Sequence, residues 1–523
     1  MKNNEQRKIV IGLIFLSVGI IFLSRLFYVQ VIDDHYKLDA ASNVLRHVVK
    51  YPARGLIYDR DGELLVFNEA AYDLMVIPRQ VKPNFDTLDF CELVGIRKDQ
   101  FVTKMEKAKA FSYHKASAFE KEIPAKAFAR IQEKLYDYPG FYTQVRTLRN
   151  YPEKTAAHIL GYIGEVNQST IKDEPYYQSG DYIGISGIEK SYEEFLRGKR
   201  GLEIVMVDVF NREKGKFMDG IYDSTAVAGS DIKLSIDADL QEYGEKLMQN
   251  KKGSIVAIDP STGEILALVS SPSYDPNLLV GRERGKNYQA LSLDTLKPLF
   301  NRSLQAKYPP GSTFKSINAL IGLQENVLTP NTLYSCRNGY HAGRLKVGCH
   351  SHRSPVNLEY SIETSCNAYY CNVFRSIIDK YPRTDAGYSV WRDYLLRFGL
   401  GQKTGIDIPN ELNGFVPDVD YYNRYYNKGG WSSLTIISLA IGQGELGFTP
   451  LQMANMTAVI ANKGYYVTPH LVKEIDGKPI FAVDSTVKKI ESGIEDRHFD
   501  LVQEAMYKVV ERGTGSLARV DSV

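Results

Sequence analysis

The chain of 523 residues lacks any large net charge. Its 64 basic and 62 acidic residues leave a formal charge of +2 at pH 7. This balance gives no argument for a nucleic acid partner or for a strongly acidic substrate. Because 44% of the residues are hydrophobic, the chain can build two or three domains with real cores.

The first half of the chain also lacks a constellation of catalytic side chains. Before residue 229 no nucleophile is grouped with a base. Strands are expected at 56–58 and 64–66 around an Asp61-Gly62 turn, and an amphipathic helix at 187–196. This half is therefore predicted to be a spacer or docking module.

One long apolar run is present near the N-terminus, over residues 9–29. About twenty apolar residues suffice to cross a bilayer. Three basic residues precede the run, and Asp33 and Asp34 follow it, so the positive-inside rule places residues 1–8 in the cytoplasm. No A-x-A cleavage site follows, which favours an anchor over a signal peptide. We expect a single-pass protein of the cytoplasmic (inner) membrane with its remainder periplasmic or extracytoplasmic.

A second domain is expected to begin near residue 229. A helix is predicted at 241–248, and two apolar strands at 254–258 and 265–269 flank the turn DPSTG at 259–263. This hairpin, followed by helices of which one begins with a serine, is the order expected of a mixed helix-and-sheet hydrolase-like domain.

The stretch YPPGSTFK at 308–315 carries the candidate nucleophile. Its prolines disfavour helix before Gly311, and the apolar spacing after it predicts a helix that starts near Ser312. Lys315 then lies on the same face as Ser312, and a partly desolvated lysine can take the serine proton. The S-x-x-K pattern alone also fits a capping serine before a surface lysine, and it recurs at Ser112, Ser169, Ser230 and Ser485.

This stretch resembles the active-site motif of class B penicillin-binding proteins, the peptidoglycan D,D-transpeptidases. Further stretches resemble that family in the same order, namely ARG at 53–55, DRDG at 59–62, GIE at 187–189, AIDPSTGE at 257–264, IGQG at 441–444 and TPLQ at 449–452. The resemblance runs from the apolar segment to the last residue, and the cysteine pattern makes it most similar to the elongation (rod-shape) type.

The resemblance implies an α+β fold in four parts. Residues 1–8 would form a cytoplasmic tail and 9–29 a transmembrane anchor. An elongated mixed pedestal, or dimerisation, domain would occupy 30–228. A serine penicillin-binding, β-lactamase-like transpeptidase domain would follow over 229–523, with helices around an antiparallel sheet.

The second motif of the family matches Ser365-Cys366-Asn367. The resemblance implies that Ser365 relays protons to the leaving amine and that Asn367 orients the acyl chain and Lys315. The S-x-N pattern also occurs at 316–318, but this stretch lies within the helix of Ser312 and is expected to be structural.

The third motif, K-T-G, occurs literally only at 403–405. In the family the catalytic K-T-G lies on a strand well after the I-G-Q-G element, whereas this one precedes it. RGTG at 512–515 resembles the turn shortly before the true motif. We therefore expect the true K-T-G beyond Val523, in a sequence that is C-terminally truncated, lacks its last strands and is inactive as given.

The resemblance also implies the reaction and the partners. Ser312 would form an acyl-enzyme with peptidoglycan stem peptides during cell-wall elongation, would be acylated by β-lactams, and would need no cofactor for acyl transfer. A membrane glycosyltransferase and elongation-complex proteins are the expected partners. The alternatives are a D,D-carboxypeptidase, a membrane-bound β-lactamase, a β-lactam sensor, or a non-catalytic scaffold for a glycosyltransferase.

Cysteine is scarce, but four of the five cysteines lie between residues 336 and 371. Cys336, Cys349, His352 and Cys366 offer a tetrahedral set of zinc ligands, with His350 as an alternative to His352. One structural Zn²⁺ would fix the loop that carries Ser365, and elongation-type members of the family resemble this arrangement. A Cys336–Cys349 disulfide or buried free thiols remain alternatives.

Overall fold

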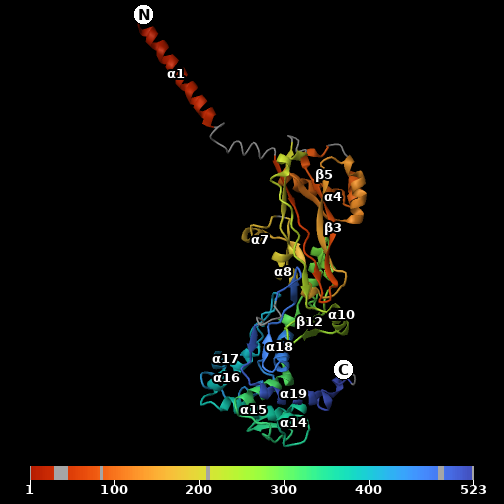
Figure 1. Ribbon diagram of the computed structural model, residues 1–523, viewed down its shortest axis with the longest axis vertical. Helices are drawn as coiled ribbons and strands as arrows, with labels where there is room; N and C mark the ends of the chain where they lie inside the picture. The colour runs from red at the N-terminus through yellow and green to blue at the C-terminus, as the bar shows by residue number, and fades with distance from the viewer. Residues whose placement is uncertain are drawn as a thin grey trace. The chain divides into compact units, whose positions relative to one another are not determined.

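The computed structural model describes residues 2–28, 45–82, 86–178, 180–207, 213–480 and 488–520. They form two compact units that alternate along the chain. The first unit comprises Met1–Arg54, Ala70–Thr147 and Arg197–Gly229, and the second comprises Gly55–Glu69, Leu148–Leu196 and Ser230–Val523. Both units mix helices and strands, as predicted (Figure 1).

The first unit is built on two small sheets. In one, β1, β8 and β9 pair antiparallel in that order, and in the other the later part of β3 pairs with β4 and with β5. The strands are β1 (Leu45–Lys50), β3 (Leu64–Val76), β4 (Ser117–Pro124), β5 (Phe141–Asn150), β8 (Gly201–Val207) and β9 (Glu213–Lys216). The helices are α1 (Lys2–Phe27), α3 (Thr87–Val94), α4 (Lys98–Phe111) and α5 (Ala125–Lys134), with the 3₁₀ turns η2 (Pro78–Gln80), η3 (Leu135–Asp137) and η4 (Phe217–Gly220).

Aromatic rings form the core of this unit. Phe90 on α3 packs with its ring centre 4.4 Å from that of Phe141 and 4.9 Å from that of Tyr138. Phe101 on α4 and Phe119 on β4 complete the cluster at 5.7 and 5.9 Å from Phe90. Such offset and edge-to-face contacts add to the free energy gained by burying the rings. This unit therefore has its own hydrophobic core.

The predicted membrane anchor at residues 9–29 overlaps α1. Part of that segment, including residue 29, lies outside the described residues. Over the part of the chain that the structure describes, no helix is both long and apolar enough to cross a membrane. The anchor therefore stays a prediction.

The second unit contains a sheet with the strand order β17-β16-β10-β2-β3, of which β3 contributes its first residues. The predicted hairpin at 56–66 is confirmed, because β2 pairs antiparallel with β3 through Ile57 and Val66. The strands of this unit are β2 (Ile57–Tyr58), β6 (Ile163–Glu165), β7 (Tyr182–Gly184), β10 (Ile232–Leu234), β11 (Gly253–Ile258), β12 (Ile265–Ser271), β13 (Gly339–Ala342), β14 (Leu345–Gly348), β15 (Tyr465–Val467), β16 (Val472–Ile475), β17 (Lys478–Pro479) and β18 (Lys489–Glu491).

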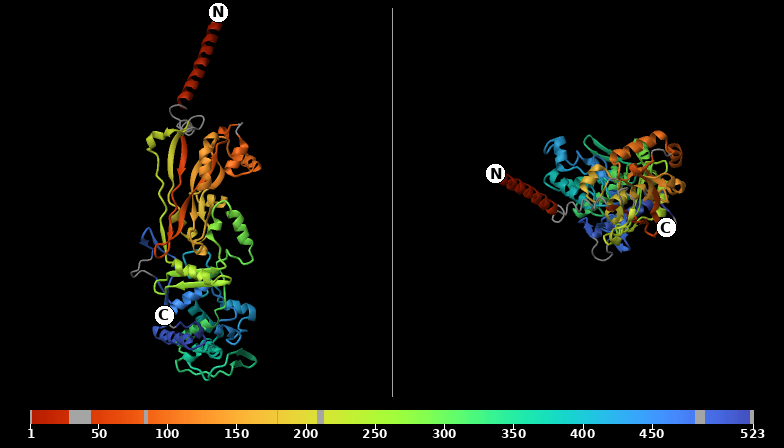
Figure 2. Two further views of the ribbon diagram at one scale, coloured as in Figure 1. Left: turned by 90° about the vertical axis from the view of Figure 1, so that its right-hand side faces the viewer. Right: turned by 90° about the horizontal axis from the view of Figure 1, so that it is seen from above.

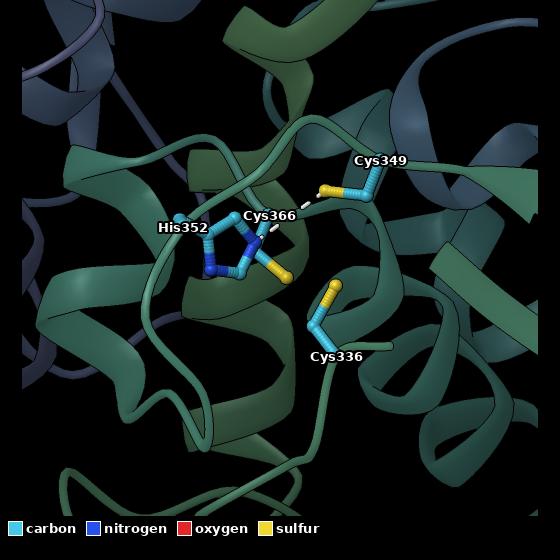
Figure 3. Close-up of side chains that lie close together, drawn as sticks. All are labelled: Cys336, Cys349, His352 and Cys366. Atoms are coloured by element: carbon cyan, nitrogen blue, oxygen red, sulfur yellow. Dashed lines mark hydrogen bonds between the residues drawn. The ribbon is translucent and has the colours of Figure 1, made fainter. Parts of the chain in front are cut away.

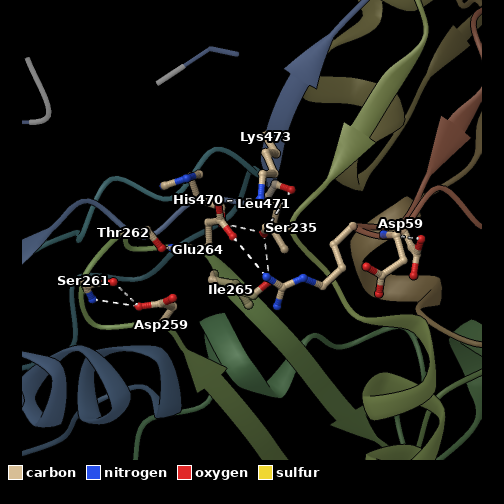
Figure 4. Close-up of polar contacts among 12 residues, drawn as sticks. Asp59, Ser235, Asp259, Ser261, Thr262, Glu264, Ile265, His470, Leu471 and Lys473 are labelled. Carbon is tan, nitrogen blue, oxygen red and sulfur yellow. Dashed lines mark hydrogen bonds and ion pairs between the residues drawn. The ribbon is translucent and has the colours of Figure 1, made fainter. Parts of the chain in front are cut away.

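The second predicted hairpin is also confirmed, since β11 and β12 lie side by side in antiparallel pairing (Figure 2). At its turn Asp259 accepts hydrogen bonds from the backbone and hydroxyl of Ser261. The carboxylate of Glu264, which precedes β12, lies 3.2 Å from Nζ of Lys473 on β16 (Figure 4). It lies 3.7 Å from the guanidinium of Arg60. Ser235 also donates its hydroxyl to the carbonyl of Ile265 at 2.8 Å. These contacts attach the hairpin to β16 and to the residue that follows β10.

The predicted helix at 187–196 is interrupted. The structure has α8 (Gly187–Ser191) and α9 (Glu193–Leu196), with Tyr192 outside helical geometry between them. Tyr192 donates its hydroxyl to Asp407 at 2.9 Å. The break is confined to Tyr192, because its N–H still donates to the carbonyl of Ile188 and its carbonyl still accepts from the N–H of Leu196, both at 3.0 Å.

The largest core of the second unit is helical. Helices α14, α15 and α19 pack against α13, and α16 packs against α15. Trp391 on α16 is fully buried against Phe314 and Phe374. The helices of this unit are α6 (Ala157–Leu160), α7 (Gln168–Asp173), α8, α9, α10 (Ala238–Leu247), α11 (Arg284–Leu293), α12 (Arg302–Gln305), α13 (Lys315–Gln324), α14 (Leu358–Glu363), α15 (Asn367–Asp379), α16 (Thr384–Arg397), α17 (Val419–Tyr426), α18 (Pro450–Ala461) and α19 (Asp496–Glu511). The 3₁₀ turns are η5 (Pro276–Leu279), η6 (Gly311–Phe314), η7 (Ile437–Ile441) and η8 (Ser516–Ala518).

Candidate active site

Ser312 lies exposed in the turn that leads into α13. The 3₁₀ turn η6 begins at Gly311, whose φ of +63° bends the chain after the two prolines. The backbone N–H of Gly311 donates to the carbonyl of Gly442 at 2.8 Å, which ties the I-G-Q-G element to this turn. A Cβ at Gly442 would lie 2.2 Å from the carbonyl oxygen of Gly311, so only glycine fits there. The helix start predicted at Ser312 is thus confirmed, with a 3₁₀ first turn.

Lys315 is buried, and its amine is surrounded by three acceptors from the second motif. Its Nζ donates to the backbone oxygen of Ser365 at 2.7 Å, to Oγ of Ser365 at 2.9 Å and to Oδ1 of Asn367 at 2.6 Å. Within the described part of the chain, no hydrogen bond joins this amine to Oγ of Ser312. The sequence placed the amine over Ser312, whereas the structure turns it toward Ser365 and Asn367.

Burial changes the acid–base properties of this amine. Desolvation lowers the pKa of Lys315 to about 8, although the thiols of Cys349, Cys366 and Cys371 oppose the shift. An ordinary lysine stays protonated at neutral pH. With a pKa of about 8, a fraction of Lys315 is neutral near pH 7 and able to accept a proton.

Ser365 is held in an unusual backbone conformation. Its φ of +53° is in the left-handed region, which is costly for a residue other than glycine. Its backbone N–H donates to the carbonyl of Ile362 at the end of α14. Its hydroxyl oxygen and its carbonyl oxygen both accept hydrogen bonds from the Lys315 amine. The next residue, Cys366, caps the N-terminus of α15 by accepting from the N–H of Tyr369 at 3.4 Å. The two helices thereby fix the position of the Ser365 hydroxyl.

Asn367 connects Lys315 to the loop that follows β14. Its Oδ1 accepts from Lys315, and its Nδ2 donates to the carbonyl of Gly348 at 2.8 Å. Its backbone N–H donates to the sulfur of Cys349 at 3.3 Å. The sequence did not indicate Gly348 as a partner, because a backbone carbonyl leaves no signature in a pattern of side chains.

The competing S-x-N at 316–318 is structural, as expected. Asn318 is fully buried, donates from Nδ2 to the carbonyl of Ala440 at 2.9 Å and accepts from the indole of Trp391 at 2.8 Å. Both ends of its amide are therefore used to join three elements of the core. This leaves Ser365 and Asn367 as the S-x-N pair in contact with Lys315.

The literal K-T-G at 403–405 is engaged in a local contact. Thr404 is buried and donates both its N–H and its hydroxyl to the carboxylate of Glu411 at 2.7 Å. Gly405 donates its N–H to the same carboxylate at 3.1 Å. These donors are thus occupied by a side chain of the protein and are not free to bind a substrate.

A cysteine–histidine cluster lies beside Asn367. The ligand atoms of Cys336, Cys349, His352 and Cys366 all lie within 4.8 Å of one another, and they point toward a common centre in Figure 3. The sulfur of Cys349 is 3.5 Å from Nε2 of His352. The sequence had left the choice between two histidines open, and the structure brings His352 to the sulfurs.

The polar surroundings of this cluster favour the metal-binding forms of His352 and Cys349, whereas burial raises the pKa of Cys336 and of Cys366. Nδ1 of His352 lies 2.9 Å from the carbonyl of Arg353, so an Nδ1–H donor leaves Nε2 free as a ligand. Burial alone would raise the pKa of Cys349, but hydrogen bonds from the Asn367 N–H and from His352 bring it below its ordinary value. A thiolate is the form of cysteine that binds a metal.

Two known protein families match this chain. Residues 253–523 match the penicillin-binding protein transpeptidase domain, and residues 49–234 match the penicillin-binding protein dimerisation domain. The first match alone covers more than half of the chain. The chain belongs to the penicillin-binding protein transpeptidases.

Individual relatives extend over nearly the whole chain. The peptidoglycan D,D-transpeptidase MrdA of Acinetobacter baumannii is 33% identical over 537 residues, covering 98% of this chain and 76% of MrdA. The structure of the Helicobacter pylori penicillin-binding protein PBP2 in complex with MreC matches with a TM-score of 0.72 and 27% identity, covering 90% of this chain and 86% of that one. A chain of a peptidoglycan synthase complex that coordinates polymerization and crosslinking matches with a TM-score of 0.69 and 26% identity, covering 99% and 87%.

Proposed function

We propose that this transpeptidase cross-links peptidoglycan stem peptides during cell-wall elongation and is a target of β-lactams. The observation that carries the proposal is the Lys315 amine, which lies in hydrogen-bond contact with both Ser365 and Asn367 one helical turn after Ser312. An amine in that position can act together with the nucleophile Ser312, the proton relay Ser365 and the substrate-binding amide of Asn367. The similarity to MrdA supports the choice of peptidoglycan as substrate.

In the proposed reaction Ser312 is the nucleophile and Lys315 the general base. Neutral Lys315 takes the proton of the Ser312 hydroxyl as Oγ attacks the carbonyl carbon of the penultimate D-Ala. The exposed backbone N–H of Ser312, at the start of η6, stabilises the oxyanion. For this step the Lys315 amine breaks one of its three hydrogen bonds and rotates toward Oγ of Ser312. Ser312 lies within one turn of Lys315, so the rotation is short.

Ser365 and Asn367 act in the breakdown of the tetrahedral intermediate. As the bond to the terminal D-Ala nitrogen breaks, Ser365 passes the proton held by Lys315 to the leaving amine. Asn367 is fixed by Gly348 on one side and Lys315 on the other, and its amide orients the acyl chain. An amine of a neighbouring stem peptide then attacks the Ser312 ester and restores the free serine.

The proposed setting is the outer face of the cytoplasmic membrane. A single-pass anchor at residues 9–29 is supported by the basic residues before it and by exposed apolar side chains of α1 such as Phe15 and Phe22. The relatives were solved with MreC and in a peptidoglycan synthase complex. We accordingly expect elongation-complex proteins and a membrane glycosyltransferase as partners of this chain.

Product analysis tests the reaction type. Incubating the full-length protein with a polymerised glycan that carries stem pentapeptides should release D-Ala and yield cross-linked peptide dimers, resolved by chromatography and mass spectrometry. A transpeptidase gives dimers because an amine captures the acyl-enzyme. Release of D-Ala with tetrapeptide monomers alone would instead identify a carboxypeptidase.

One structural Zn²⁺ is also proposed for Cys336, Cys349, His352 and Cys366. Three sulfurs and one imidazole nitrogen within 4.8 Å of one another are a donor set typical of structural zinc. The metal would fix the turn between α14 and α15, because Cys366 is flanked by Ser365 and Asn367. Its role would be to hold the proton relay in place, with no part in acyl transfer.

Metal content distinguishes the two histidines. Purified protein should hold about one equivalent of zinc. His352→Ala should lower the zinc content several-fold and slow acylation by penicillin about tenfold, because the Ser365 loop loses its anchor. His350→Ala is the matched control, since His350 is outside the four-residue cluster, and should retain zinc. Wild-type protein with clearly less than one equivalent would refute the site.

A further inference from the structure

A cavity in the second unit has no part in the proposed acyl transfer. Its volume is about 160 Å³. A cavity of about 150 Å³ can hold a benzene ring. The lining residues come from four stretches of the chain and are His158, Tyr162, Ser186, Gly187, Tyr274, Tyr288, Leu299, Asn301, Gln305, Ile408, Pro409 and Asn410.

The lining is aromatic and polar, and none of these lining residues is acidic, lysine or arginine. Tyr162, Tyr274 and Tyr288 contribute three aromatic side chains, and the Tyr274 hydroxyl donates to the carbonyl of Ala157 at 3.5 Å. The one titratable imidazole, His158, is neutral at physiological pH, because burial lowers its pKa to about 4. Its Nε2 lies 2.8 Å from the carbonyl of Pro298. The cavity thus suits an uncharged ring with several hydroxyl or amide groups.

The polar side chains are positioned with hydrogen-bond donors to spare. Asn301 accepts through Oδ1 from the N–H of Ser303 at 3.1 Å, and Gln305 accepts through Oε1 from the N–H of Asn301 at 3.2 Å. Each amide oxygen is therefore engaged. Within the described part of the chain, neither amide NH₂ group of this pair has an acceptor.

The walls of the cavity include closely packed backbone. Gly187, the first residue of the G-I-E stretch, lines the cavity with a φ of +57°, and a Cβ there would lie 2.3 Å from the carbonyl oxygen of Ile159. On the other side, the guanidinium of Arg284 stacks 5.7 Å from the centre of the Tyr162 ring. Tyr288, on α11, is 45% exposed and gives the cavity a side chain at the solvent boundary.

We propose that this cavity binds one N-acetylated sugar ring of a glycan strand. Aromatic faces pack on the apolar face of a sugar ring, and neutral amide and phenol groups hydrogen-bond its hydroxyl and acetamido groups. A stem peptide carries free carboxylates and would need a basic lining. The choice of a glycan rests on the proposed function, in which the stem peptides arrive attached to a glycan, and the cavity would hold that strand while Ser312 reacts.

Titration with β-1,4-linked N-acetylglucosamine tetramer, followed by calorimetry or ligand-observed NMR, tests this site. The wild-type protein should bind the tetramer, and Tyr288→Ala should weaken binding about five- to tenfold through loss of one stacking face. Tyr243→Ala is the matched control, because Tyr243 is an exposed tyrosine of α10 outside the lining, and it should bind as the wild type does. Leu299→Trp, which fills the cavity, should abolish binding.

Penicillin acylation of each variant separates the sugar site from the acyl-transfer proposal. All variants should be acylated at the wild-type rate, which also shows that they are folded. No binding by acylation-competent wild type, equal binding by Tyr288→Ala and Leu299→Trp, or competition at the cavity by a free stem pentapeptide would overturn the sugar site alone. Binding that follows the expected pattern in a protein that penicillin does not acylate would support the sugar site and overturn the acyl-transfer proposal.

Discussion

Replacing Ser312 by alanine should abolish covalent labelling of the full-length protein by a fluorescent penicillin. The labelling rate should fall by about 10³-fold or more, because the oxygen that forms the acyl bond is removed. Ser312 is exposed at the start of η6, so alanine there creates no cavity in the core. Gel fluorescence after timed exposure measures the rate, and thermal unfolding should be nearly unchanged.

Ser169→Ala is the matched control for this prediction. Ser169 also begins an S-x-x-K pattern, but its hydroxyl donates to Oδ1 of Asn167 at 2.7 Å on the exposed helix α7. Its replacement should leave labelling unchanged. Persistent labelling of Ser312→Ala, or loss of labelling in Ser169→Ala with the protein still folded, would show that the nucleophile is a different residue.

The two hairpins show what the sequence predicts well. Both depend on turn residues and on apolar strands close in the chain, and β2–β3 and β11–β12 formed where the pattern placed them. The helix at 187–196 shows the limit, because the structure divides it at Tyr192, whose hydroxyl donates to the distant residue Asp407. Local periodicity predicts local structure, and a contact with a distant residue can override it.

In the candidate site, too, the sequence predicts some features and misses others that depend on distant residues. The motifs indicated Ser312, Lys315, Ser365 and Asn367, and the resemblance implied that Asn367 orients Lys315. Neither indicated that, among the described residues, the Lys315 amine makes no hydrogen bond to Ser312. Spacing likewise indicated the cysteine cluster, whereas the choice of His352 needed the distance from its Nε2 to Cys349. A side-chain rotamer depends on which groups surround it, and those groups come from separate helices and loops.

Lys315→Met should slow penicillin acylation by about 10²- to 10⁴-fold, the range expected for loss of a general base. Methionine keeps most of the buried volume of Lys315, so the variant isolates the amine from the packing. Lys380→Met is the matched control. The amine of Lys380 also donates to a backbone carbonyl and to a side chain, both of Glu325 at 2.8 and 2.7 Å, and its loss should leave acylation unchanged.

The pH dependence of the wild-type protein distinguishes a base from a purely structural amine. Only neutral Lys315 can accept the Ser312 proton, and burial lowers its pKa to about 8. Acylation should therefore rise about tenfold per pH unit below that pKa and level off above it. Asn367→Asp should move the inflection to higher pH, because a carboxylate 2.6 Å from Nζ would favour the protonated amine. A flat profile between about pH 6 and 9, with Lys315→Met inactive but folded, would restrict Lys315 to positioning Ser365 and Asn367.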